Sequence, residues 1–202
     1  MGRVRTIIVG VLISLALAGP AAAQASLFGS EGEKFLKAIR EDDVATALPI
    51  LQQPGSHTIN YRGYDGDTAL HIVTRTRNLT WIRYLLSRGA DANVGDAKGE
   101  SALMTAARIG YYDATDVLLR SGARVDFTNK QGETALILAV QLRQAQIVRR
   151  LLEAGADANR TDHVAGLSAR DYAKRDSRNP ELLRLIDNIK PAKSAIIGPT
   201  IK

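Results

Sequence analysis

The chain has 202 residues, of which 45% are hydrophobic and 24% charged, so it can form one compact domain and is not disordered throughout. Only 5% of the residues are aromatic, which favours packed helices. The formal charge is +6, but the basic residues do not form the dense stripe that nucleic-acid binding requires. Because the sequence contains no cysteine, disulfides and thioether lipid anchors are excluded, and packing alone must hold the fold.

The N-terminus has the three-part order of a secretory signal peptide. Arg3 and Arg5 precede an uncharged, mostly apolar run over residues 7–18, and small residues dominate positions 21–25. The apolar run is about 12 residues long, which is too short to cross a hydrocarbon core of about 30 Å comfortably. A cleaved signal is therefore favoured over the alternatives, an uncleaved membrane anchor or a core helix.

Two cleavage sites fit the preference for small residues, one ending at Ala23 and one at Ala25. We favour the second, which makes residues 1–25 the signal peptide and Ser26 the first residue of the mature chain. The expected location is the periplasm or the extracellular medium. No membrane span is expected after cleavage, and export further disfavours a nucleic-acid partner.

Residues 26–64 are expected to form a capping helix pair and a linker. Within residues 31–53, apolar side chains recur at helical spacing. They are Phe35, Leu36, Ile39, Val44, Leu48 and Leu51. Pro54 and Gly55 then mark the end of the second helix. Because this stretch lacks the motif that repeats further along the chain, we interpret it as an N-terminal cap.

The middle of the chain repeats with a period of 33 residues. Two sets of glycines have this period, Gly66, Gly99 and Gly132 in one set and Gly89, Gly122 and Gly155 in the other. The first set is followed by Thr68, Ser101 and Thr134, whose hydroxyls can accept a hydrogen bond from an amide at a helix start. We predict three units, over about residues 65–95, 96–128 and 129–161.

Each unit is expected to contain a second helix that closes the core. Its apolar stripe ends in two leucines, which are Leu85 and Leu86, Leu118 and Leu119, and Leu151 and Leu152. The glycine that follows each pair is placed to end the helix in a left-handed conformation. Trp81 belongs to the first stripe, where we favour core packing over a role as a binding anchor.

Residues 162–189 look like a degenerate copy of the same unit. Gly166 begins its motif, Arg170 replaces the motif leucine, and a second helix is expected over about residues 180–189. A charged residue at position 170 suits a last unit that has no further neighbour to bury its outer face. We interpret this segment as the C-terminal cap and residues 190–202 as a mobile basic tail.

The repeated motif resembles that of the ankyrin-repeat family. Gly66-Asp-Thr-Ala-Leu-His71 and its later copies match the family's period and its Thr-Pro-Leu-His signature, with Ala69, Ala102 and Ala135 in the proline position. This departure removes a preset first-turn dihedral but supplies a good helix former. The resemblance implies an all-α solenoid of stacked helix-turn-helix repeats joined by hairpin-like turns, with a protein partner bound on its concave face.

No motif of a known catalytic site occurs in the sequence, and neither a cofactor nor an enzymatic activity is expected. The three histidines lie far apart, which disfavours a metal site, and in ankyrin repeats the histidine at the position of His71 makes structural hydrogen bonds. The stretch from Asp91 to Asp96 lacks the glycine that a calcium loop requires. Asp65 and Asp67 flank a turn glycine, which favours solvated turn residues that bond local amides over a catalytic carboxylate pair.

The family resemblance places partner binding on the hairpin tips and the first helices. On this sequence the face would present Tyr64, Asp65, Asp67, Arg75, Lys98, Glu100, Arg108, Ile109, Lys130, Glu133 and Gln141, with Tyr111 and Tyr112 near it. Tyrosine and arginine are enriched at interface hot spots because they bury a large area and keep a polar group. The alternative for Arg75 and Arg108 is that they are solvated helix residues without a binding role.

The sequence therefore favours an exported, monomeric ankyrin-repeat protein that binds an unidentified protein and catalyses nothing. An alternative is a secreted effector or inhibitor that acts on a protein of a host or of a competing cell. A third interpretation, an enzyme with an unrecognised site, is disfavoured by the missing catalytic motifs. The identity of the partner is not encoded in the fold, because one fold supports many unrelated functions.

Overall fold

The computed structural model describes residues 30–53 and 58–189. The predicted signal peptide and the predicted C-terminal tail lie outside these ranges, as do Pro54 and Gly55. Ten α-helices occur within the described ranges, and a 3-10 helix, η1 (Thr58–Asn60), follows the second of them. The α-helices are α2 (Glu31–Arg40), α3 (Val44–Gln52), α4 (Ala69–Arg75), α5 (Leu79–Ser87), α6 (Ala102–Arg108), α7 (Tyr112–Arg120), α8 (Ala135–Gln141), α9 (Ala145–Glu153), α10 (Ala169–Arg175) and α11 (Pro180–Asn188).

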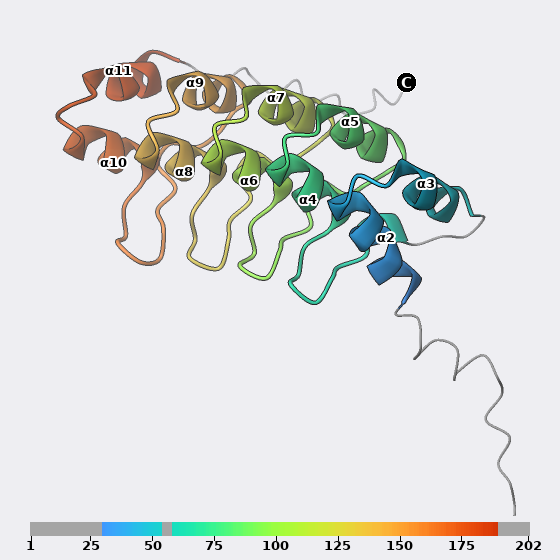
Figure 1. Ribbon diagram of the computed structural model, residues 1–202. Coiled ribbons are helices and arrows are strands. Elements are labelled where there is room, and N and C mark those ends of the chain that lie inside the picture. The colour runs from blue at the N-terminus through green and yellow to red at the C-terminus, as the bar shows by residue number, and fades with distance from the viewer. Residues whose placement is uncertain (1–29, 54–57, 190–202) are drawn as a thin grey trace, which may run out of the picture. The chain divides into compact units, whose positions relative to one another are not determined.

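The helices form two adjacent rows (Figure 1). The first row contains α2, α4, α6, α8 and α10, and each of these helices contacts the next. The second row contains α3, α5, α7, α9 and α11, and each first-row helix also packs against its partner in the second row. Hairpin loops project from the first row on the side away from the second (Figure 1). This arrangement confirms the predicted all-α solenoid of helix-turn-helix repeats.

The first helices begin at the hydroxyl residues that the motif predicts. The Ser101 Oγ atom accepts a hydrogen bond of 3.3 Å from the Met104 amide, and Thr134 Oγ1 accepts one of 3.2 Å from the Ile137 amide. The degenerate last copy uses the same device, because Ser168 precedes α10 and accepts from the backbone of Asp171. These bonds satisfy amides that a helix start leaves without a partner.

The core lies between the two rows and runs through all the repeats. The first leucine of each predicted pair is fully buried, whereas Leu86 and Leu119 are partly exposed and pack at the edge of the core. Trp81 is buried in the core, as predicted, and its indole N–H donates a 2.9 Å hydrogen bond to Asp42 Oδ1 in the turn between α2 and α3. This hydrogen bond therefore joins the first helix pair to the first repeat.

Asparagine and aspartate side chains connect successive repeats at the ends of the second helices. Asn60 Oδ1 accepts a 2.8 Å hydrogen bond from the amide of Asp91, one repeat later. Asn93 Oδ1 accepts one of 2.7 Å from Arg124, and Asp126 Oδ1 one of 3.0 Å from Asp157. These short polar side chains fix the stacking of one repeat on the next, because each satisfies a loop amide of its neighbour.

The last repeat ends the solenoid with a charged face. The Arg170 guanidinium, at the motif leucine position, bonds to Asn159 Oδ1 at 3.1 Å and pairs with the Asp187 carboxylate of α11. An arginine at this position is therefore held by polar partners instead of being buried in the core. None of the helices within residues 30–53 and 58–189 has the length and apolar content needed to cross a bilayer.

Candidate protein-binding face

The hairpin loops are shaped by side chains that bond their own backbone. Asp65 Oδ1 accepts a 3.1 Å hydrogen bond from the Asp67 amide, as predicted for a turn residue. In the next hairpin, Asp96 Oδ1 accepts from the amides of Lys98 and Glu100 at 2.8 and 2.9 Å. Asn129 repeats this pattern in the third hairpin. The hairpins are thus ordered by local bonds before any partner contacts them.

Two arginines at the ends of first-row helices reach back to carboxylates in the hairpins. Arg75 donates to Asp67 Oδ2 at 2.7 Å and to Oδ1 at 2.9 Å, and Arg108 makes the matching forked pair with Glu100 one repeat later. The prediction that Asp67 is a solvated turn residue is wrong, because Asp67 is only 5% exposed and Glu100 only 6%. Hydrogen bonding to these carboxylates raises the pKa of Arg75 and of Arg108.

The two ion pairs line one groove, which we call the inner groove. It has a volume of about 440 Å³ and lies between the first two hairpins and the ends of α4 and α6. Its lining residues are Asp65, Asp67, Arg75, Asp96, Ala97, Lys98, Glu100, Thr105, Arg108 and Ile109. The structure therefore brings seven of the thirteen predicted face residues around a single groove, two of them as fixed guanidinium groups.

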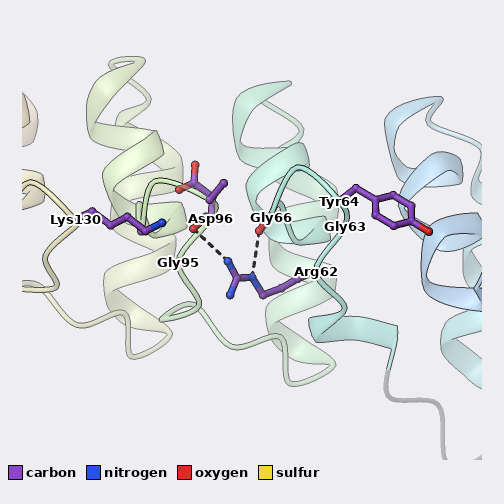
Figure 2. Close-up of a pocket in the computed structure, with 9 residues that line it drawn as sticks. Arg62, Gly63, Tyr64, Gly66, Gly95, Asp96 and Lys130 are labelled. Atoms are coloured by element: carbon purple, nitrogen blue, oxygen red, sulfur yellow. Dashed lines mark hydrogen bonds between the residues drawn. The ribbon is translucent and has the colours of Figure 1, made fainter.

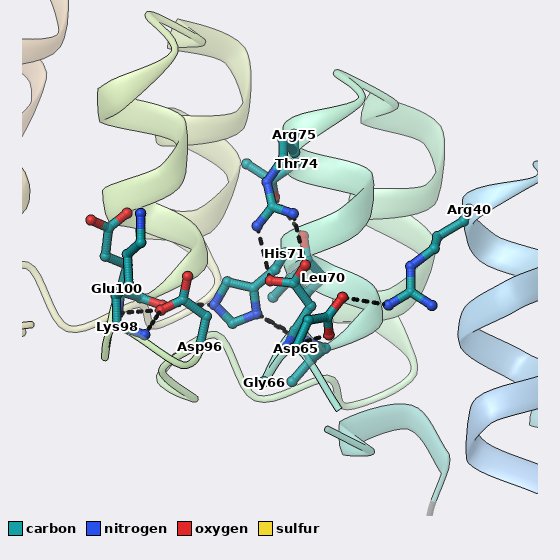
Figure 3. Close-up of polar contacts among 12 residues, drawn as sticks. Arg40, Asp65, Gly66, Leu70, His71, Thr74, Arg75, Asp96, Lys98 and Glu100 are labelled. Carbon is teal, nitrogen blue, oxygen red and sulfur yellow. Dashed lines mark hydrogen bonds and ion pairs between the residues drawn. The ribbon is translucent and has the colours of Figure 1, made fainter. Parts of the chain in front are cut away.

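His71 lies between the first hairpin and the second and joins them through hydrogen bonds (Figure 3). Its Nε2 atom lies 2.8 Å from the Glu100 carbonyl oxygen, which can only accept, so Nε2 carries the proton. Nδ1 then accepts from the Thr68 amide at 3.2 Å and from the Thr68 hydroxyl at 2.9 Å. The structural role that the family resemblance implies for His71 is confirmed. Burial lowers the pKa of the imidazole below its ordinary value, because charging it there would cost solvation.

Replacing His71 with methionine, the residue that the second repeat has at this position, should remove a pH-dependent part of the stability. The folded-state pKa of His71 is lowered, so the unfolded chain binds its proton first as the pH falls below about 6.5. Wild-type stability should therefore fall from pH 7.5 towards pH 5.5, while His71→Met should start about 1–3 kcal/mol lower and fall less. Urea unfolding at several pH values measures the difference, and a constant gap between the two proteins would contradict this role.

A second cleft spans the tips of three successive hairpins (Figure 2). We call it the tip cleft; its volume is about 660 Å³, and its lining includes Arg62, Tyr64, Asp96 and Lys130. Arg62 donates to the carbonyl oxygens of Gly66 at 3.4 Å and Asp96 at 3.2 Å, so it ties the first tip to the second. Tyr64 is 93% exposed and points away from Lys130 (Figure 2). Arg62 lies before the repeated motif, and no pattern in the sequence marked it.

The other predicted residues lie further along the face or away from it. Glu133 accepts a 2.8 Å hydrogen bond from Asn129 Nδ2, and Gln141 ends α8 beside a separate cleft. Tyr111 lies in the turn between α6 and α7, where its hydroxyl donates to the Arg77 carbonyl at 3.1 Å. Tyr112 is not part of this face, because it begins α7 in the second row and lines a hollow against α9. The sequence placed Tyr112 close to a turn between two helices, but it did not show that this residue would lie in the second row.

Metal ligands do not gather in the part of the chain that the structure describes. Within residues 30–53 and 58–189, no three histidine, aspartate or glutamate side chains lie close enough together to hold a metal ion. The acidic residues of the hairpins instead bond arginines and backbone amides. These bonds engage the hairpin carboxylates within the chain itself.

Known proteins share the repeated part of this chain. A family model described as ankyrin repeats in three copies matches residues 35–129 and 80–162, which together cover more than half of the chain. A probable E3 ubiquitin-protein ligase, XBOS33, from Oryza sativa subsp. japonica is 31% identical over 89 residues, 44% of this chain and 17% of that protein. SH3 and multiple ankyrin repeat domains protein 2 from Homo sapiens is 35% identical over 69 residues, 34% of this chain and 4% of that protein. The match thus spans less than a fifth of either relative.

Proposed function

This chain belongs to the ankyrin-repeat family, and from that premise we propose that it binds a protein through its hairpins and first-row helices and catalyses no reaction. The inner groove is the observation that carries the proposal. Its two arginines are already fixed by Asp67 and Glu100, so little side-chain freedom is lost when a partner binds. The ligase name of one relative belongs to a protein of which the match covers only 17%, and it gives no reason to propose catalysis here.

We also propose that the chain is exported, on the basis of the basic, apolar and small-residue order of residues 3–25. Expression of the full chain with a C-terminal tag in a bacterium should place the shorter, processed product in the periplasm or the medium. N-terminal sequencing should then begin at Ser26. A full-length product that stays in the cytoplasm would contradict export, whereas accumulation in the medium would favour an effector that acts outside the cell.

Partner binding is tested by a tagged chain of residues 26–202, which contains the compact unit that starts at Glu31. We call the surface formed by the hairpins and the first-row helices the inner face. The inner-face variant combines Tyr64→Ser, Lys98→Ser and Lys130→Ser, three exposed side chains that make no hydrogen bond to any described residue. It should capture at least about tenfold less of a specific partner from an envelope extract than the wild-type chain does, because hot-spot truncations cost about 2 kcal/mol or more.

The matched control changes one tyrosine and two cations on the second row, Tyr112→Ser, Arg83→Ser and Arg149→Ser. These side chains are also exposed, and the change in net charge is the same. Circular dichroism should show that both variants remain helical. Retained capture by the control and lost capture by the inner-face variant is the expected result; the reverse pattern would place the interface on the second row and overturn the proposal.

A further inference from the structure

A cleft at the C-terminal end of the first row has an excess of positive charge. We call it the basic cleft; its volume is about 310 Å³, and its polar lining residues are Gln141, Arg143, Tyr172, Arg175, Asp176 and Arg178. These residues come from the ends of α8 and α10 and from the turns that follow them. Three of the lining residues are arginines and one is an aspartate, so the lining residues themselves carry two more positive than negative charges.

The single carboxylate of the basic cleft is fully engaged. Arg143 donates to Asp176 Oδ2 at 2.7 Å and to Oδ1 at 3.0 Å, and the Arg178 amide lies 3.3 Å from Oδ1. Hydrogen bonding to Arg143 lowers the pKa of Asp176, so the carboxylate stays charged. No hydrogen bond or ion pair joins the guanidinium of Arg175 or of Arg178 to a residue within the described ranges.

The free guanidinium of Arg175 follows from a break in the repeat pattern. Arg75 and Arg108 each pair with the acidic residue eight positions earlier, directly after the first glycine of the motif. In the last copy, Leu167 follows Gly166 and takes the place of that acid, and Arg175 is the residue eight positions later. The last copy therefore keeps the arginine of the pair, Arg175, but has no acidic residue at the position that would pair with it.

The side chains around the basic cleft leave the guanidinium groups of Arg175 and Arg178 without a hydrogen-bond partner among the described residues. Tyr172 donates a 2.6 Å hydrogen bond to Asp162 Oδ2, and this bond raises the pKa of the phenol, which stays neutral. The carbonyl ends of α8 and α10 each contribute about half a negative charge at most. Asp162 and Asp171 add negative charge beside the cleft, but Asp162 is engaged by Tyr172 and three hairpin amides, and Asp171 is engaged by Ser168. The unpaired guanidinium donors of Arg175 and Arg178, and not the net charge, therefore favour a carboxylate.

We propose that the basic cleft binds an acidic segment of a protein partner, whose carboxylate takes the place of the acid missing before Arg175. This inference rests on the proposed function, since it names the chemistry of the partner that the face binds. Arginine pairs with carboxylate through two parallel hydrogen bonds, which gives such a contact direction as well as charge.

The test is a titration of the ¹⁵N-labelled chain, residues 26–202, with a capped hexaglutamate peptide at low salt, followed by nuclear magnetic resonance. Amide signals around Gln141–Arg143 and Tyr172–Arg178 should shift. The double variant Arg175→Gln, Arg178→Gln should bind the peptide at least about fivefold more weakly. The control Arg83→Gln, Arg184→Gln has the same net charge and should change binding by less than about twofold. Equal weakening in both would mean charge attraction without a site and would overturn the proposal.

A second pair of variants tests the missing carboxylate itself. Leu167→Glu should restore the acid, pair with Arg175 and weaken hexaglutamate binding by about fivefold. Val164→Glu adds the same charge at a 79% exposed position of the same hairpin and should have little effect. Equal binding by both variants, or inorganic phosphate binding as tightly as the peptide, would contradict a carboxylate site. If hexaglutamate fails while capture still depends on the inner face, only this inference fails.

Discussion

Replacing Leu136 with alanine is expected to lower the free energy of unfolding by about 2–5 kcal/mol. Leu136 is fully buried in α8, which contacts α6 on one side and α10 on the other. The shorter side chain leaves a cavity between stacked repeats, and neither neighbour can fill it without moving. Since domains of this kind are stable by about 5–15 kcal/mol, the change should shift the midpoint of urea unfolding strongly.

Leu142 provides the matched control, because it directly follows α8 and is 44% exposed. Leu142→Ala makes the same chemical change without opening a cavity and should alter the free energy of unfolding by no more than about 0.5 kcal/mol. Circular dichroism in urea measures both variants. A loss of equal size in the two proteins would contradict the placement of Leu136 in the shared core.

Replacing Gly66 with alanine should cost about 2–5 kcal/mol, for two separate reasons. Gly66 has a φ of 79°, in the left-handed region that costs other residues about 1–2 kcal/mol. A Cβ atom would also lie 2.4 Å from the Ala97 backbone nitrogen in the next hairpin. Because that contact is with backbone, the two hairpins must separate, and we expect crowding to add about 1–3 kcal/mol.

Gly122 separates these two causes. Its φ is 88°, but a Cβ atom there would meet nothing within 4 Å. Gly122→Ala should therefore carry only the backbone cost of about 1–2 kcal/mol. Thermal and urea unfolding of the two variants measure the difference. If Gly122→Ala were as harmful as Gly66→Ala, the close packing of successive hairpins would not explain the requirement for glycine.

The sequence alone was sufficient to predict the repeat architecture, because each repeat uses the same local devices. The hydroxyls of Ser101 and Thr134 cap helices as the motif predicts. Gly122 takes up the left-handed conformation expected after a second helix. Local spacing is enough for such features, since their bonds reach only three or four residues along the chain.

The polar contacts of the face could not be predicted in the same way. The pairing of Asp67 with Arg75 requires the arginine to fold back over the first helix onto the hairpin, and helix periodicity does not specify that path. Arg62 bonds carbonyl oxygens of two hairpins, a contact that depends on their spacing in three dimensions. Comparing Leu167 with its acidic counterparts could have marked Arg175 from the sequence, but only once the Asp67–Arg75 pair was known.

The inner face thus combines rigid and exposed elements. Arg75 and Arg108 are held in forked pairs, while Tyr64 and Lys130 extend from the hairpin tips. Fixed polar groups give a partner a defined set of hydrogen-bond positions, and exposed tips give it area to bury. This combination suits recognition of a protein surface better than enclosure of a small molecule, because the inner groove and the tip cleft both lie at the surface, along the hairpins and the ends of the first-row helices.

Hydrogen exchange of the chain with and without its captured partner tests the central claim most directly. We expect amide exchange to slow on binding in the hairpins at residues 62–68 and 95–101 and in α4 and α6, while α5 and α7 stay unchanged. Slower exchange confined to the second row, with the hairpins unchanged, would contradict binding through the inner face.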